Sequence, residues 1–286
     1  MEPRSRFVPG ADGLRLHALE WSSEGVPFVL LHGFGNEAHV WDDLARVVAA
    51  YYRTLALDLR GHGDSDPDPE AGYDHVSMAR DVEAATEGLG FERLVLLGHS
   101  MGGRVALRFA GKHPERMAGL ILVDTGPDLD PRGVTRIRLE TGRQTLTFES
   151  TAAYEELLGS LYPSARPETL ARLAITGLRP LSDGRYERKL DPALSRRHES
   201  VSAEEWRAWA DAETKVLWDA LARIPCPILI VRGAASDVLS PDTAERMVEA
   251  APRATLVEIP RASHSVMLDN PEGLRSAVAE FALTDA

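Results

Sequence analysis

Ser100 lies in a short glycine-flanked sequence that is typical of an activated nucleophile. The sequence is Gly98-His99-Ser100-Met101-Gly102, and it comes between an apolar run, Leu94–Leu97, and a stretch of helical spacing at 104–110. A serine at a sharp strand-to-helix turn lifts its hydroxyl clear of the sheet, and the neighbouring glycines leave room for that turn. The pattern predicts a nucleophilic serine for acyl transfer. The alternative is a tight turn whose serine has no chemical role.

A histidine late in the chain is the best candidate for the base that this serine needs. A serine hydroxyl is nearly neutral at pH 7, so a base must lie within hydrogen-bond reach. His264 follows the last apolar run and precedes the last helical stretch. Loops at the carboxyl ends of parallel strands gather at one edge of a sheet, so His264 can approach Ser100 there. The alternative is an ordinary surface histidine. His99 should leave the turn in another direction, and weaker candidates lie in other loops: His32, His62 and His75.

Two aspartates compete for the position that would hold the imidazole in one tautomer. Asp237 follows the apolar run Ile228–Gly233, and Asp124 ends the run Leu120–Val123. The order serine, aspartate, histidine is expected for such a site on this kind of sheet. We expect Asp237 to be the acid and keep Asp124, otherwise a turn residue, as its competitor.

Acyl transfer also requires hydrogen-bond donors for the oxyanion that forms on the carbonyl oxygen. The backbone N–H of Met101, directly after the serine, is one candidate. The glycine-rich turn His32-Gly33-Phe34-Gly35 follows the apolar run Phe28–Leu31, and the N–H of Phe34 is the best-placed second donor.

Apolar runs and helical stretches alternate along most of the chain, which predicts a doubly wound, mostly parallel α/β sheet with helices on both faces. The expected strands are Leu14–Leu19, Pro27–Leu31, Thr54–Asp58, Leu94–Gly98, Leu120–Asp124, Ile228–Gly233 and Thr255–Ile259. The expected core helices are His39–Ala50, Val76–Leu89, Ser100–Ala110, Pro241–Ala250 and Pro271–Ala282.

The alternation stops between residues 127 and 221, where helical stretches occur without a convincing buried strand. A connection of that length in an α/β domain is usually a functional element of its own. We therefore expect residues 1–126 and 222–286 to form the core, and residues 127–221 to form an inserted helical cap. Its aromatic side chains either build the cap's own core or cover a substrate pocket; the candidates for substrate contact are Phe148, Tyr154, Tyr162, Trp206 and Trp209.

Composition excludes several classes of protein. The 286 residues are 44% hydrophobic and 27% charged, as in ordinary globular proteins. The net charge of −12 disfavours nucleic-acid and membrane partners. The single cysteine permits no internal disulfide, and no apolar run reaches the length of a membrane span or a signal peptide, so we expect a soluble cytoplasmic protein. Dinucleotide, phosphate-loop and metal-ligand motifs are absent from the sequence, and the expected chemistry needs neither a cofactor nor a metal.

These segments together resemble the α/β-hydrolase family of single-chain esterases, lactonases and C–C hydrolases. The resemblance rests on residues 32–35, 58–65, 98–103 and 237–241 and on His264. It implies an eight-stranded sheet and a serine hydrolase that cleaves a small to medium, mostly uncharged carboxylic ester or lactone. Two alternatives remain: a C–C bond hydrolase with the same residues, and a ligand receptor on the same fold. Relatives with an aspartate nucleophile are disfavoured because Ser100 occupies that position.

Overall fold

The computed structural model describes residues 2–142, 146–196 and 203–284. In this part of the chain eight strands form one mixed sheet in the order β1-β2-β4-β3-β5-β6-β10-β11. The first two pairings are antiparallel, and all the others are parallel. The expected doubly wound, mostly parallel fold is therefore confirmed. The strands are β1 (Arg4–Pro9), β2 (Arg15–Glu20), β3 (Pro27–Leu31), β4 (Arg53–Leu57), β5 (Leu94–His99), β6 (Met117–Val123), β10 (Ile228–Gly233) and β11 (Ala254–Ile259).

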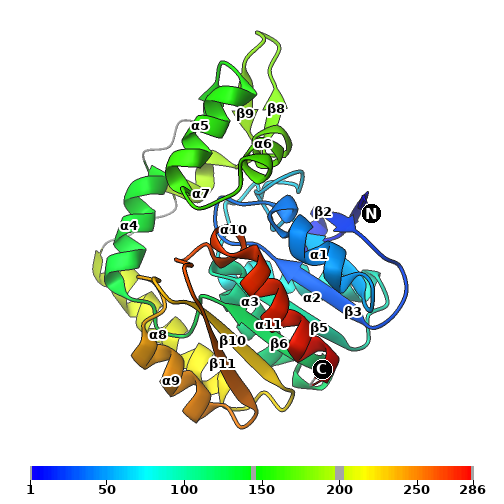
Figure 1. Cartoon of the computed structure of the whole chain (residues 1–286), viewed down its shortest axis with the longest axis vertical. Helices are drawn as coiled ribbons and strands as arrows, with labels where there is room; N and C mark the ends of the chain where they lie inside the picture. The colour runs from blue at the N-terminus through cyan, green and yellow to red at the C-terminus, as the bar shows by residue number, and fades with distance from the viewer. Residues whose placement is uncertain (1, 143–145, 197–202, 285–286) are drawn as a thin grey trace.

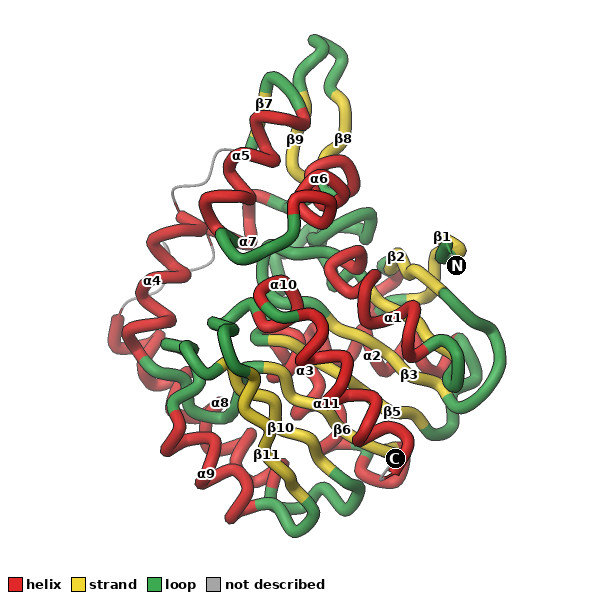
Figure 2. The backbone as a smooth tube through the Cα atoms, viewed as in Figure 1, coloured by secondary structure: helices red, strands yellow, loops and turns green. Residues whose placement is uncertain are grey.

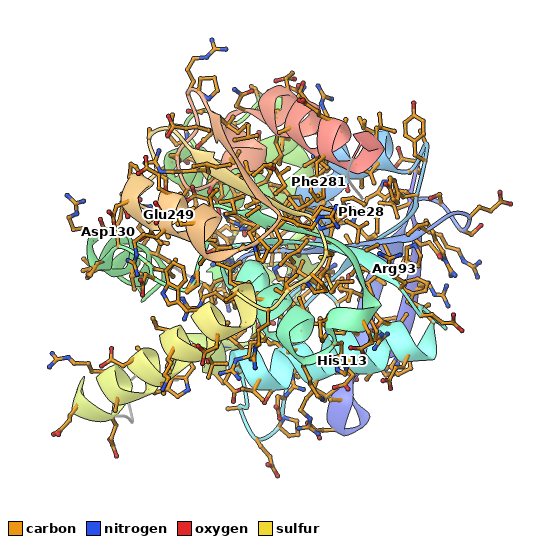
Figure 3. The ribbon with its side chains drawn as sticks, turned by 90° about the horizontal axis from the view of Figure 1, so that it is seen from below. Phe28, Arg93, His113, Asp130, Glu249 and Phe281 are labelled. Atoms are coloured by element: carbon orange, nitrogen blue, oxygen red, sulfur yellow. The ribbon has the colours of Figure 1, made fainter. Side chains whose placement is uncertain are left out.

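Helices cover both faces of this sheet (Figures 1 and 2). The central strands are apolar on both sides: Phe28 and Leu30 of β3 face one apolar cluster, and Val29 and Leu31 face another. Figure 3 shows Phe28 in the interior together with Phe281 of α11. The helices that flank the sheet are α1 (Asp42–Val48), α2 (His75–Gly88), α3 (Met101–Lys112), α9 (Pro241–Ala250) and α11 (Pro271–Thr284), and α8 (Ala203–Leu221) packs on α3 and α9.

Two helices in the carboxyl half begin with a proline that follows a capping side chain. Ser240 accepts the N–H of Thr243 at 3.0 Å and Asn270 accepts the N–H of Gly273 at 2.9 Å, so both cap a helix that begins with proline. Several of the described elements have no counterpart among the expected ones, among them β1, α4 (Pro131–Gly142) and α10 (Val266–Asp269). In β1 only Val8 is buried, so this edge strand lacks the apolar run by which the others were recognised.

The segment between β6 and β10 rises above the carboxyl edge of the sheet (Figure 1). We call residues 127–221 the inserted segment. Besides α4 and α8 it contains short strands that pair in the order β7-β9-β8, which the sequence did not predict. Its last helix, α8, packs along α3, and Leu217 and Leu221 join an apolar cluster of the sheet. The remaining elements are β7 (Thr147–Phe148), α5 (Thr151–Leu161), α6 (Pro167–Thr176), β8 (Leu178–Pro180), β9 (Tyr186–Arg188) and α7 (Pro192–Arg196).

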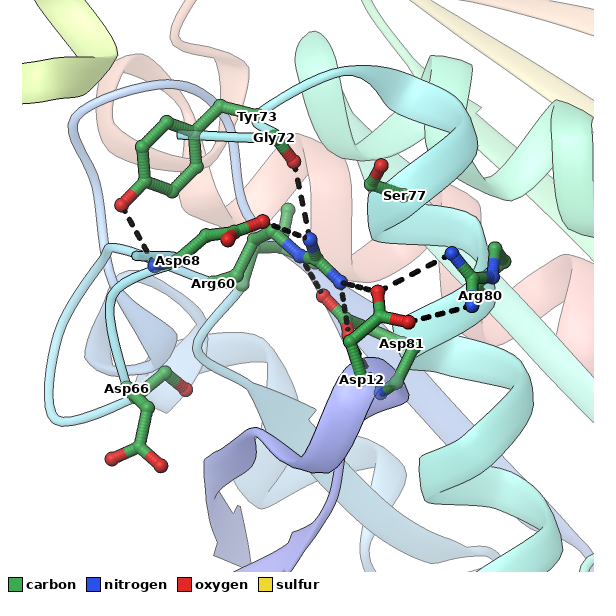
Figure 4. Close-up of polar contacts among 12 residues, drawn as sticks. Asp12, Arg60, Asp66, Asp68, Gly72, Tyr73, Ser77, Arg80 and Asp81 are labelled. Carbon is green, nitrogen blue, oxygen red and sulfur yellow. Dashed lines mark hydrogen bonds and ion pairs between the residues drawn. The ribbon is translucent and has the colours of Figure 1, made fainter. Parts of the chain in front are cut away.

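A buried arginine fixes the loop that follows β4 (Figure 4). The guanidinium of Arg60 donates to both carboxylate oxygens of Asp81 in α2, at 2.6 and 2.8 Å, and to Asp68 at 2.6 Å. Asp81 also accepts the N–H of Ala11 at 2.9 Å. A buried charge is tolerated only when it is paired in this way, and the pairing ties residues 58–68 to α2. None of the described helices combines the length and the apolar character required to cross a membrane.

Candidate active site

Ser100 sits at the turn between β5 and α3 in a strained conformation, with φ 52° and ψ −118°. Its N–H donates to the Val123 carbonyl at 3.1 Å, which fixes the turn against β6. A Cβ atom at residue 98 would lie 2.3 Å from the carbonyl oxygen of Gly102, so only glycine fits at this point. A non-glycine residue held in such a conformation is typical of functional sites.

His264 lies beside this serine, as expected from the sequence. Its Nε2 is 3.0 Å from the Oγ of Ser100. Two contacts hold the loop that carries His264. The Nε2–H of His99 donates to the His264 carbonyl at 2.9 Å, and Asp269 accepts the N–H of Ser263 at 2.8 Å. The loops after β5 and β11 are thus joined at the carboxyl edge of the sheet.

The carboxylate that touches His264 belongs to Asp124. Its Oδ2 is 2.8 Å from the Nδ1 of His264, and the residue is fully buried. Asp124 also accepts the Gly233 N–H at 2.9 Å and the Ser236 hydroxyl at 2.5 Å. Because a carboxylate can only accept, Nδ1 carries the proton and Nε2 presents its lone pair to Ser100. A serine hydroxyl held against a histidine that a carboxylate orients is an arrangement suited to nucleophilic catalysis.

Asp237, the acid expected from the sequence, lines the same cavity as Ser100 but does not take the position beside His264, which Asp124 occupies instead. The guanidinium of Arg136, in α4, donates two hydrogen bonds to the Asp237 carboxylate at 2.7 and 2.8 Å, and it also contacts Glu140 at 3.0 Å. This pairing holds the pKa of Asp237 below its usual value. Ser236, one residue earlier, fills the space beside Asp124 and also accepts the N–H of Val238 at 3.1 Å, so the loop directs Asp237 away from His264.

The two expected oxyanion donors lie at the ends of neighbouring strands. Met101 is the first residue of α3, so its N–H has no acceptor within the helix. Phe34 follows β3, which pairs with β5, and it lines the same cavity as Ser100. A Cβ atom at Gly33 would lie 3.2 Å from the Cβ of Ser100, which shows how closely this turn approaches the serine.

The other candidate histidines have different surroundings. Burial holds the pKa of His99 well below its usual value, and it lowers the pKa of His62 to about 3. His32 is buried as well, and its pKa is lowered by the same cause. His75 lies 3.1 Å from the carboxylate of Glu213 in α8. Of the described histidines, only His264 contacts both Ser100 and a carboxylate.

A cavity of about 330 Å³ opens above Ser100. Of the aromatic residues expected to contact substrate, Tyr154 and Tyr162 line it, whereas Phe148 packs against Tyr154 with ring centroids 4.9 Å apart. Trp209 is not among its described lining residues; its ring centroid lies 5.9 Å from that of His75, the first residue of α2. The side chain of Trp206 lies outside the described residues. Sequence periodicity gave no signal for several further wall residues, among them Asn36, Arg136, Glu140, Leu158, Leu161 and Arg188.

One group of potential metal ligands occurs in the described part of the chain: His17, Asp58 and Asp64. The ring nitrogens of His17 already contact Asp58 and Ser5, both at 2.8 Å. Asp58 also accepts the N–H groups of Ala38 at 2.6 Å and Asp64 at 2.9 Å. These hydrogen bonds account for the cluster as part of the fold.

Known proteins share this architecture. A family model described as the alpha/beta hydrolase fold matches residues 26–271. A 3-hydroxybutyrate-oligomer hydrolase from Cupriavidus necator is 30% identical over 290 residues, covering 98% of each chain. A 2-hydroxy-6-oxononadienedioate/2-hydroxy-6-oxononatrienedioate hydrolase from Cupriavidus pinatubonensis is 28% identical over 287 residues, covering 97% of this chain and 94% of its own.

A solved structure has the same fold. The crystal structure of E-2-(acetamidomethylene)succinate hydrolase superposes with a TM-score of 0.86 at 25% identity, covering 99% of this chain and 100% of its own. The family match extends over most of the chain, and the named relatives are hydrolases. The chain belongs to the alpha/beta hydrolase family and is a hydrolase.

Proposed function

We propose that this protein is a serine hydrolase that cleaves a small to medium carboxylic ester or lactone through an acyl-enzyme. The observation that carries the proposal is the continuous contact from Asp124 through His264 to Ser100, with separations of 2.8 and 3.0 Å, beneath a cavity of about 330 Å³. Such a cavity is of the size that small-molecule sites occupy. The 30% identity to a 3-hydroxybutyrate-oligomer hydrolase is consistent with this reaction.

In the first half of the reaction, Ser100 attacks the carbonyl carbon of the substrate. His264 accepts the hydroxyl proton at Nε2 as the new C–O bond forms, and Asp124 stabilises the resulting imidazolium through Nδ1–H. The negative charge that develops on the carbonyl oxygen is met by the N–H groups of Phe34 and Met101. The proton on His264 then passes to the leaving oxygen as the ester bond breaks.

The second half reverses these roles with water. His264 takes a proton from a water molecule, the resulting hydroxide attacks the acyl carbon, and the bond to Ser100 Oγ breaks. The proton returns from His264 to Ser100, and the acid is released. A lactone would open by the same steps and leave as one hydroxy acid.

We further propose that the inserted segment acts as a cap over this site. Wall residues come both from the core, as with Phe34 and His264, and from the inserted segment, as with Leu161 and Tyr162. The bond between Arg136 and Asp237 joins α4 to the loop after β10 at the same cavity. The cap would then choose the substrate while the core supplies the reacting groups.

A panel of p-nitrophenyl esters of increasing acyl length, together with a series of lactones, tests the proposed reaction on the purified protein. We expect the wild-type protein to hydrolyse at least one member of the panel, and we expect the Ser100→Ala protein not to hydrolyse it. Tight binding of panel members without product would instead favour a ligand receptor on this fold.

The cap residues allow a selectivity prediction. Leu161→Ala should change the ratio of kcat/KM between long and short acyl chains by about tenfold, since fit around a few methylene groups is worth roughly that much. Trp209→Ala is the matched control, because Trp209 packs against His75 away from the cavity and should lower the melting temperature without altering the ratio. A changed ratio in Trp209→Ala with an unchanged ratio in Leu161→Ala would place the acyl group under α8 instead.

A second candidate is a C–C bond hydrolase with the same reacting residues. A relative named for nonadienedioate and nonatrienedioate substrates is 28% identical to this chain. Arg188, a buried residue of the cavity wall, is a cation suited to a carboxylate of such a substrate. Turnover of an acid-bearing vinylogous diketone at a higher kcat/KM than any ester or lactone of the panel would favour this reading over the ester hydrolase.

A further inference from the structure

His32, at the end of β3, makes two hydrogen bonds that fix its protonation. The backbone N–H of Leu59 lies 3.0 Å from Nε2, and the carbonyl oxygen of Gly33 lies 2.8 Å from Nδ1. A backbone N–H can only donate, so Nε2 must be an unprotonated acceptor. Nδ1 therefore carries the hydrogen and donates it to the Gly33 carbonyl. Burial lowers the pKa of His32, although nearby Asp58 acts in the opposite direction. The lowered pKa favours the neutral ring.

The Gly33 carbonyl belongs to the same peptide unit as the N–H of Phe34. A second donor, the N–H of Asn36, approaches this carbonyl at 3.2 Å. No cis peptide bond occurs in the described chain, and in a planar trans peptide the C=O and the following N–H point in opposite directions. Two donors that hold the carbonyl therefore also set the direction of the Phe34 N–H.

This peptide unit lies next to the serine. A Cβ at Gly33 would come within 3.2 Å of the Ser100 Cβ and 2.6 Å of the His99 Nδ1, so glycine is required for the approach. Phe34 lines the cavity that contains Ser100. The imidazole of His32 is itself packed against that of His62, with ring centroids 5.0 Å apart.

We infer that His32 is a positioning residue that orients the Phe34 N–H toward the oxyanion next to Ser100, through the hydrogen bond from its Nδ1 to the Gly33 carbonyl. This inference rests on the proposed function. His32 touches no reacting atom; it acts by holding one peptide unit at the angle that the transition state needs. A donor aimed in advance in this way stabilises the transition state more than the bound substrate.

Two substitutions separate the two hydrogen bonds of the ring. In His32→Asn the amide nitrogen takes the place of Nδ1, so the donor to Gly33 is kept and the acceptor for Leu59 is lost. In His32→Gln the amide oxygen takes the place of Nε2, so the acceptor is kept and the donor is lost. Each variant loses one buried hydrogen bond, so their melting temperatures should fall by similar amounts.

We expect His32→Gln to lower kcat for the best ester by about 10-fold to 100-fold with little change in KM, somewhat less than the roughly 10²–10³ that follows loss of an oxyanion donor. Its affinity for a boronic acid that mimics the tetrahedral intermediate should fall by the same factor. His32→Asn should stay within about threefold of wild type in both measurements. Equal losses in the two variants, or full activity in His32→Gln, would overturn the inference.

A measurement on the wild type covers the case in which His32→Gln does not fold. Proton–nitrogen correlation spectra of the imidazoles should show His32 as the neutral Nδ1–H tautomer at pH 7. An Nε2–H tautomer, which has no hydrogen on Nδ1 to donate to Gly33, would refute the positioning role. Failure of the proposed function has a different signature, because the wild type would then hydrolyse no ester or lactone while the tautomer remained as stated.

Discussion

Ser100→Ala is expected to lower kcat by about 10⁴-fold to 10⁶-fold, because oxyanion donors and substrate binding alone give only residual catalysis once the attacking hydroxyl is gone. Steady-state kinetics on the best ester of the panel, paired with a melting curve, measures the effect. Ser160→Ala is the matched control, since the hydroxyl of this exposed serine donates to the Leu157 carbonyl within α5, and kcat should not change. A folded Ser100→Ala protein with more than a few per cent of wild-type activity would show that another group attacks the substrate.

Asp124→Asn should be the next most damaging substitution, with a loss of about 10⁴ in kcat near neutral pH, the effect known for the same change in a serine protease. The amide nitrogen can donate to Nδ1 of His264, which favours the tautomer whose Nε2 carries the proton and cannot accept from Ser100. The backbone fold should survive because asparagine has the same shape as aspartate. Asp124 also accepts hydrogen bonds from Gly233 and Ser236, so a melting curve should accompany the kinetics to show that the variant is folded.

Asp237→Asn is the comparison that separates the two aspartates. Its carboxylate pairs with Arg136 and is about two-fifths exposed, so its loss should change kcat by only a few-fold and stability by no more than about 1 kcal/mol. A folded Asp237→Asn protein without activity, beside an active Asp124→Asn protein, would restore Asp237 as the acid.

Most of the sheet could be predicted because its strands are buried on both faces. Strand β10 and helix α9 have the bounds expected from the sequence. An apolar run defines β10, and a proline that follows the capping Ser240 marks the start of α9. The edge strand β1 could not be found in this way, because it has one buried residue and depends on pairing with β2 for its conformation.

The choice between the two aspartates could not be made from local sequence. Both follow parallel strands and both reach the same edge of the sheet. What separates them is a contact between residues 101 positions apart, Arg136 with Asp237, together with the hydroxyl of Ser236 beside Asp124. A contact of that range depends on how the inserted segment folds back, and helical periodicity carries no information about it.

The aromatic pair in α8 illustrates the same limit. Spacing places Trp206 and Trp209 on one face of a helix, but it does not say which surface that face meets. In the structure α8 returns along α3, and the inserted segment contributes to the cavity wall through α4, α5 and β9 instead. The wall residues Leu158 and Leu161 carry no feature that distinguishes them from ordinary helix core residues in a single sequence.

Covalent capture tests the role of Ser100 most directly. The wild-type protein is treated with a fluorophosphonate, its intact mass is measured, and the modified residue is located by peptide mass spectrometry. We expect one adduct per chain on Ser100, formed in step with the loss of esterase activity, and none in Ser100→Ala. An adduct on another residue, or full activity in protein that is fully modified at Ser100, would contradict the proposed mechanism.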